Sequence, residues 1–132
     1  MKPSPVTFGT DGWRAVIADA FTYENLRAVS VALAQYLRQK HPQKLARGIV
    51  IGYDTRFMAR DFAEIAAQTI AAEGISVRVA GRDCPTPAIA WAVRGEELAC
   101  GIILTASHNP PRYSGFKFVE PDGSPADKEA TD

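Results

Sequence analysis

Segments with a helical pattern alternate along this sequence with short, strongly apolar segments. Such alternation is typical of an α/β layer structure with a largely parallel sheet. Thr22 is a suitable N-cap for the first helix, and Pro42 is a suitable stop. Between them, apolar residues recur at three- and four-residue spacing, as on one face of an amphipathic helix: Leu26, Val29, Leu33, Tyr36 and Leu37.

The later segments continue this alternation. Phe62 to Ile70 forms a second helical stripe that ends at Gly74, and Thr86 followed by Pro87 is typical of the start of a short helix, which Gly95 closes. Extended structure is predicted for 6–13, broken at Gly9 and Gly12, and for 48–53, 75–79, 98–106 and 115–120, with a loop over 107–114. We therefore predict a three-layer α/β/α domain with a mostly parallel mixed sheet of about four strands and an antiparallel edge strand.

Length and composition agree with one domain over residues 1–132. The chain has 132 residues, of which 46% are hydrophobic and 23% charged, so it can form an ordinary core and is not intrinsically disordered. The predicted core covers about 6–120, and the polar segment 121–132 is a tail or a severed interdomain linker. Cys84 and Cys100 have no metal-ligand or redox spacing, which favours buried apolar roles.

The charge balance argues against several classes of partner. Lys+Arg and Asp+Glu number 15 each, so we expect no binding to nucleic acid or to an anionic membrane. The longest purely apolar run, Ile102–Leu104, is far too short to span a bilayer. Met1–Thr7 lacks the apolar segment of a secretory signal. These features favour a soluble, cytoplasmic domain.

Candidate chemistry lies at the expected carboxyl ends of two strands, where α/β proteins gather functional loops. The sequence lacks the GxxxxGK[ST], GxGxxG, GxSxG and HExxH motifs, which removes the main support for NTPase, dinucleotide, α/β-hydrolase and zinc-protease functions. Ser107 directly follows an apolar strand, and its neighbour His108 can donate a hydrogen bond to a phosphate. Taken alone, an ordinary turn is the better explanation of this segment. Asp54 and Arg56 are either a site rim or a structural ion pair.

Two cations are further candidates. Lys117 is predicted on the last strand, on the face opposite its aromatic neighbours, where it can bind a phosphate or exchange a proton with an alkoxide. The alternative is a solvated lysine on an edge strand. Arg14 is expected in a tight glycine turn, where it either binds a phosphate bidentately or covers the indole of Trp13.

Four of these segments resemble motifs of the α-D-phosphohexomutases, the phosphoglucomutase/phosphomannomutase family. Thr105–Pro110 resembles the TASHNP phosphoserine loop, and Phe8–Arg14 resembles the opening FGTDGxR motif. Gly52–Arg56 resembles the GxDxR element, and Gly115–Lys117 resembles the G[FIY]K segment. The four motifs occur in the family's order and cover nearly the whole chain.

The sequence departs from the family pattern in two residues and in length. Ser114 stands where the family usually has Asn, and it can still hydrogen-bond in a turn. Ala59 stands where the family often has a Ser that caps the second helix. Family members have four domains, and the magnesium-binding loop of the second is absent here. The resemblance therefore implies the first, phosphoserine-bearing domain alone.

The resemblance also implies a mechanism and roles for the candidate residues. Ser107 would pass a phosphoryl group to a hexose phosphate through a bound 1,6-bisphosphate, with Lys117 and His108 as further catalytic residues. Arg14, Ser107, His108 and Lys117 would bind the substrate. Mg²⁺ would bind to the phosphate on Ser107, with its other ligands in a missing domain, and glucose 1,6-bisphosphate would act as activator or intermediate.

The expected partners are hexose phosphates and the remaining domains of the same polypeptide, and the isolated domain is expected to be inactive. Two alternatives belong to other classes of protein. One is a non-catalytic α/β module that binds an anion or a phosphosugar. The other is an interaction domain whose Ala-rich helices dock a partner.

Overall fold

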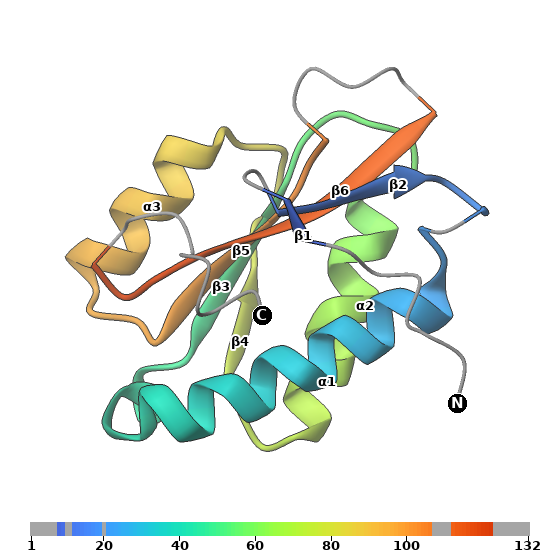
Figure 1. Cartoon of the computed structure of the whole chain (residues 1–132). Coiled ribbons are helices and arrows are strands. Elements are labelled where there is room, and N and C mark those ends of the chain that lie inside the picture. The colour runs from blue at the N-terminus through green and yellow to red at the C-terminus, as the bar shows by residue number, and fades with distance from the viewer. Residues whose placement is uncertain (1–7, 10–11, 20, 107–111, 123–132) are drawn as a thin grey trace.

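The computed structural model describes residues 8–9, 12–19, 21–106 and 112–122. A six-stranded sheet with the strand order β1-β2-β6-β5-β3-β4 forms its centre (Figure 1). The strands are β1 (Phe8–Gly9), β2 (Gly12–Val16), β3 (Ile49–Tyr53), β4 (Val77–Val79), β5 (Cys100–Leu104) and β6 (Tyr113–Val119). The helices are α1 (Tyr23–Lys40), the 3-10 helix η1 (Pro42–Arg47), α2 (Ala59–Ala72) and α3 (Thr86–Gly95).

The predicted fold class is confirmed. β3 pairs in parallel with β4 and β5, whereas β6 is antiparallel to both β5 and β2, and β1 is antiparallel to β2. Consequently β2, β3, β4 and β5 share one direction. Helices α1 and α2 cover one face of the sheet and α3 covers the other, which gives the expected three layers (Figure 1).

The N-terminal segment differs from its prediction. Extended structure over 6–13, broken at Gly9 and Gly12, was expected, and the described residues form two strands that end and begin at these glycines, but the second strand continues to Val16. Because β2 pairs with β6, the strand that carries Lys117 lies inside the sheet and has a neighbour on each side. That strand begins at Tyr113 and ends at Val119, where the sequence predicted 115–120.

The larger core lies between the sheet and the helices α1 and α2. Thr22 caps α1 as predicted, because its Oγ1 accepts a hydrogen bond from the N–H of Asn25 at 3.2 Å. The Trp13 ring stacks on Phe21 with their centroids 4.4 Å apart, and Phe21 meets Phe62 edge to face at 4.8 Å. All three rings are buried, so β2 packs against α2 through Phe21, which lies two positions before the start of α1.

Helix α3 packs closely on the other face because two glycines leave room for it. A Cβ added at Gly52 would lie 2.6 Å from Ile89 Cδ1, and one added at Gly101 would lie 2.5 Å from Val93 Cγ2. The predicted cap of this helix is wrong by one residue, since Pro85 is the N-cap and Thr86 is already helical. Helix α2 begins at Ala59 without a side-chain cap and follows Met58, whose φ is 60°.

Candidate active site

The carboxyl ends of β3 and β5 bring Asp54 and Thr105 together. The two strands pair in parallel up to Tyr53 and Leu104, so the next residue of each lies at the same edge of the sheet. Thr105 Oγ1 donates a hydrogen bond to Asp54 Oδ2 at 2.5 Å. The sequence predicted this edge as the place of chemistry, and the geometry confirms that segments 53–56 and 105–106 meet there.

Arg56 joins the same group through its backbone and its side chain. Its N–H donates to Asp54 Oδ1 at 2.9 Å, which closes an Asx-type turn, and its Nε lies 3.3 Å from Asp54 Oδ2. Its Nη1 donates to the carbonyl oxygen of Tyr113 at 3.4 Å. The side chain of Arg56 is only 13% exposed and that of Asp54 26%. The two residues therefore form the ion pair that was one of the two alternatives left open by the sequence, and the other alternative, a site rim, stays a prediction.

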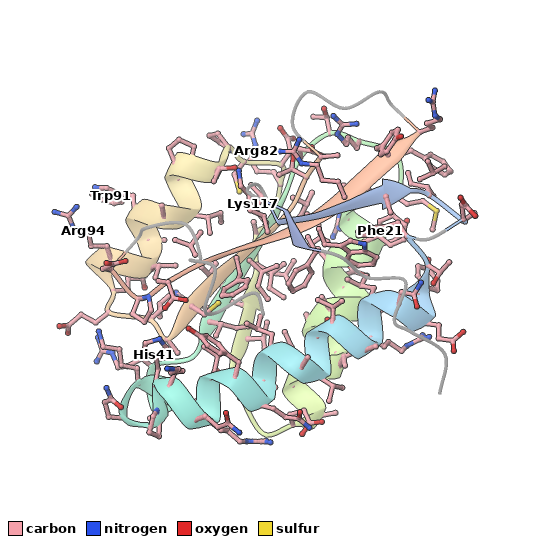
Figure 2. All side chains as sticks on the ribbon, viewed as in Figure 1. Phe21, His41, Arg82, Trp91, Arg94 and Lys117 are labelled. Atoms are coloured by element: carbon pink, nitrogen blue, oxygen red, sulfur yellow. The ribbon has the colours of Figure 1, made fainter. Side chains whose placement is uncertain are left out.

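Lys117 and Arg14 lie on one face of the sheet, on neighbouring strands. Phe116 and Phe118 are buried in the core against α1 and α2, so Lys117 between them faces the side of α3 (Figure 2). Arg14 is cross-strand to Gly115, two residues before Lys117 on β6 and on the same face. Both cations are partly exposed on this face.

Two sequence-based alternatives for these cations are wrong. Lys117 is not on an edge strand, because β6 is paired on both sides. Arg14 lies in β2 and not in a turn, and it does not cover the indole of Trp13, because successive side chains of a strand point to opposite faces and Trp13 is buried against Phe21.

Gly115 brings the candidate residues of three strands close together. A Cβ at this position would clash with the carbonyl oxygen of Thr105 and would lie 2.9 Å from that of Trp13. It would also lie 3.1 Å from Arg14 Cγ. Because Gly115 has no side chain, the side chain of Arg14 can lie over β6 next to the end of β5.

Ser114 does not occupy a turn, contrary to expectation. It lies in β6 and is completely buried, and its Oγ has no hydrogen-bond partner among the described residues. This residue therefore belongs to the core side of the strand and not to the candidate site.

Ser107 and His108 fall outside the described residues, so the structure does not test their predicted roles. Their described neighbours in the sequence are Ala106 before them and Arg112 after them. In the described part of the chain, no group of three or more His, Cys, Asp or Glu side chains could hold a metal ion. Within those same residues, no helix is long and apolar enough to cross a membrane.

Sequence reasoning missed two members of the site, the Thr105 hydroxyl and the Tyr113 carbonyl. Thr105 was part of a recognised motif, but its partner Asp54 lies 51 positions earlier, and only the strand register joins them. A backbone carbonyl carries no sequence signal at all. The parallel order of β3 and β5 was the available clue.

Comparisons with known proteins show the family to which this chain belongs. Residues 5–132 match the family model described as phosphoglucomutase/phosphomannomutase, alpha/beta/alpha domain I. A phosphoglucomutase of Komagataeibacter xylinus is 34% identical over 98% of this chain and 26% of its own length. A phosphoglucosamine mutase of Prochlorococcus marinus is 38% identical over 88% of this chain and 24% of its own length.

Solved structures give the same result. A crystal structure from Thermus thermophilus, assigned as a phosphomannomutase, superposes with a TM-score of 0.87 and 39% identity. The superposition covers 96% of this chain and 28% of that protein. A phosphoglucomutase/phosphomannomutase family protein of Burkholderia thailandensis has a TM-score of 0.79 and 25% identity, covering 99% of this chain and 30% of its own. The chain spans about a quarter of the length of the curated relatives named here.

Proposed function

Because the chain belongs to the phosphoglucomutase/phosphomannomutase family and corresponds to its domain I, we propose that it supplies the catalytic serine of a phosphohexomutase. The parent protein would interconvert hexose 1-phosphate and hexose 6-phosphate. Ser107 would carry the transferred phosphoryl group, and a hexose 1,6-bisphosphate would be the bound intermediate. The observation that carries the proposal is the match over residues 5–132, with the candidate cations of that domain gathered on one sheet face.

The proposed step is a phosphoryl transfer between two oxygens. A hydroxyl oxygen of the sugar phosphate forms a bond to phosphorus while the bond from phosphorus to Ser107 Oγ breaks. A base takes up the proton of the attacking hydroxyl, and the departing Ser107 oxygen gains a proton, so that free serine remains. After the bisphosphate reorients, its other phosphoryl group returns to Ser107. Such a transition state spreads charge over the phosphoryl oxygens, so positioning and nearby cations provide most of the catalysis.

The described cations suit these tasks. Lys117 is proposed to transfer the proton at the reacting hydroxyl or to stabilise charge beside it. Arg14, on the same sheet face, is proposed to bind the substrate phosphate, since a guanidinium can hold a phosphate with two parallel hydrogen bonds. His108 is proposed as a hydrogen-bond donor to substrate or phosphate.

A phosphoserine oxygen is a hard anionic donor of the kind that Mg²⁺ prefers, and the ion would neutralise phosphoryl charge there. The described residues contain no group of three or more His, Cys, Asp or Glu side chains that could complete a Mg²⁺ site around it. The other protein ligands would therefore come from a domain beyond domain I. Because those ligands would be missing, we propose that the isolated 132-residue chain has no mutase activity. It should still fold, because its sheet and helices form a core of their own.

Label transfer tests the proposal. The parent protein and the isolated chain would each be incubated with Mg²⁺ and ³²P-labelled glucose 1,6-bisphosphate, and the label would be located by peptide mapping. We expect label on Ser107 in the parent and none in the isolated chain. Ser107→Ala in the parent should abolish both label and turnover, whereas Ser76→Ala, at an exposed serine before β4, should change neither.

Three results would contradict the proposal. Near-normal mutase rates in Ser107→Ala would show that this serine is not the carrier. Binding of a hexose phosphate by a folded parent that never labels Ser107 would favour the non-catalytic phosphosugar-binding module. Turnover by highly purified isolated chain would show that one domain suffices.

A further inference from the structure

We propose that Asp54 and Arg56 are positioning residues that hold both ends of the segment carrying the reactive serine. This inference rests on the proposed function, because it gives the pair a task in phosphoryl transfer. The alternative is that the pair only stabilises the fold. The contacts at Thr105 and Tyr113, on either side of that segment, favour the positioning role.

The first end is held through Thr105, two positions before Ser107. Its hydroxyl donates to Asp54 Oδ2 at 2.5 Å, and the residue is only 7% exposed. The N–H of Asp54 also donates to the carbonyl of Leu104 at 3.3 Å. Asp54 thus contacts two successive residues, Leu104 and Thr105, at the point where the chain leaves β5.

The second end is held through Tyr113, the first residue of β6. Arg56 Nη1 donates to the carbonyl oxygen of Tyr113 at 3.4 Å. The same guanidinium contacts Asp54 Oδ2 through Nε at 3.3 Å. One ion pair therefore connects the residue that enters the segment with the residue that leaves it.

The pair is itself restrained, which a positioning role requires. The backbone N–H of Arg56 donates to Asp54 Oδ1 at 2.9 Å, so the Asp54 side chain is held by the backbone of Arg56. Its guanidinium is mostly buried, and charge-assisted hydrogen bonds of this kind are stronger and more directional than neutral ones. By contrast, Arg78 on β4 forms an ion pair with Glu96, the residue that follows α3, and these side chains are 57% and 50% exposed. Exposed pairs of that kind contribute little.

Positioning matters for the proposed chemistry because transfer requires the reacting atoms to be aligned. A displacement of about 1 Å at a reacting group can cost on the order of 100-fold in rate. Loss of the Asp54–Thr105 contact should therefore lower the rate of phosphoryl transfer far more than it weakens the binding of the sugar phosphate, because two of the proposed substrate-binding residues, Arg14 and Lys117, lie on β2 and β6.

The decisive experiment compares two substitutions at one position in the full-length parent. Thr105→Ser keeps the hydroxyl that donates to Asp54, whereas Thr105→Val keeps the shape and removes it. We expect Thr105→Val to lower kcat and the single-turnover rate of Ser107 labelling about 100-fold, with KM within about threefold of wild type. In Thr105→Ser, both rates should lie within about threefold of the wild-type rates. Arg56→Lys, which cannot make the same two contacts, should behave like Thr105→Val, and the exposed-pair control Arg78→Met should behave like wild type.

Thermal unfolding of each variant separates positioning from stability. The proposal is overturned if Thr105→Val labels Ser107 at the wild-type rate. It is also overturned if the rate loss disappears when each variant is assayed well below its own Tm, because the pair would then only stabilise the fold. If Ser107→Ala remains active, the proposed function itself is wrong. If Ser107→Ala is inactive but Thr105→Val keeps the wild-type kcat and labelling rate, only the positioning role of Asp54 and Arg56 is wrong.

Discussion

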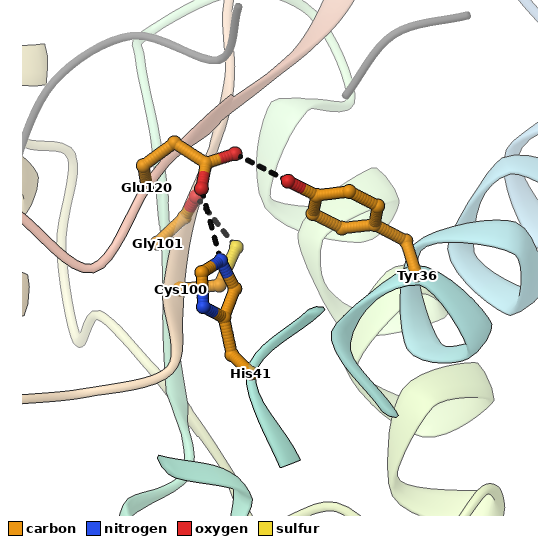
Figure 3. Close-up of polar contacts among 5 residues, drawn as sticks. All are labelled: Tyr36, His41, Cys100, Gly101 and Glu120. Carbon is orange, nitrogen blue, oxygen red and sulfur yellow. Dashed lines mark hydrogen bonds and ion pairs between the residues drawn. The ribbon is translucent and has the colours of Figure 1, made fainter. Parts of the chain in front are cut away.

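Tyr36 and Glu120, 84 positions apart in the sequence, meet through a hydrogen bond of 2.9 Å from the Tyr36 hydroxyl to Glu120 Oε1 (Figure 3). The other carboxylate oxygen, Oε2, lies 3.0 Å from His41 Nε2. These contacts join the C-terminal end of α1 to the residue that follows β6. They lie at the end of the sheet opposite Asp54 and Arg56, so they secure the chain where it leaves β6 without touching the candidate site.

The first prediction concerns the stability that this contact provides. Tyr36→Phe should lower the free energy of unfolding by about 1 kcal/mol, because it removes one partly buried hydrogen bond to a carboxylate. Urea denaturation measures the change. Tyr23→Phe is the matched control, since the Tyr23 side chain is exposed at the start of α1. Equal stability of the two variants would show that the contact contributes nothing.

The second prediction concerns Cys100, which lies beside this cluster. Burial, and secondarily the charge of Glu120, raises the pKa of its thiol above the ordinary value of 9.0. The unfolded chain therefore loses this proton at lower pH than the folded chain. The stability contribution of the neutral thiol is complete below about pH 9 and is lost as the pH rises further.

Cys100→Ala removes this linkage. Above about pH 9, the free energy of unfolding of wild type should fall more steeply than that of Cys100→Ala, by about 1.4 kcal/mol per pH unit. Urea denaturation over a pH series that spans this value measures both slopes. Parallel slopes would mean that the folded and unfolded chains bind this proton equally.

Local signals explain which parts of the fold could be predicted. Helix α1 followed from Thr22, Pro42 and one apolar stripe, all of which act within a few residues. Strand β2 was not predicted beyond Trp13, because its extension depends on pairing with β6, which lies far along the sequence. The same limit applies to the site: the sequence placed Asp54 and Thr105 at one edge, but only the register of β3 and β5 brings them into contact.

The third prediction tests the close approach at Gly115. Gly115→Ala should lower the free energy of unfolding by about 2 kcal/mol, because its Cβ would press on the carbonyl oxygens of Thr105 and Trp13, and backbone atoms cannot move aside cheaply. Gly81→Ala is the control, since no atom lies within 4 Å of its added Cβ. A Gly115→Ala variant as stable as Gly81→Ala would show that β2, β5 and β6 separate without cost.

The fourth prediction distinguishes the two roles proposed for Lys117. Lys117→Met in the parent should leave a folded protein whose kcat is lower by roughly 100- to 10,000-fold, as expected for loss of general acid–base help. Lys44→Met is a matched control, because Lys44 is also partly buried but lies in η1, before β3, at the opposite end of the sheet. Its kcat should stay close to that of wild type.

Lys117→Arg then separates proton transfer from charge stabilisation. A guanidinium keeps the positive charge but does not release its proton in the neutral range. If Lys117 transfers the proton, Lys117→Arg should be as slow as Lys117→Met. If it stabilises charge, Lys117→Arg should recover most of the lost rate. Wild-type kcat in Lys117→Met itself would remove this residue from the mechanism and leave Arg14 as the other candidate cation.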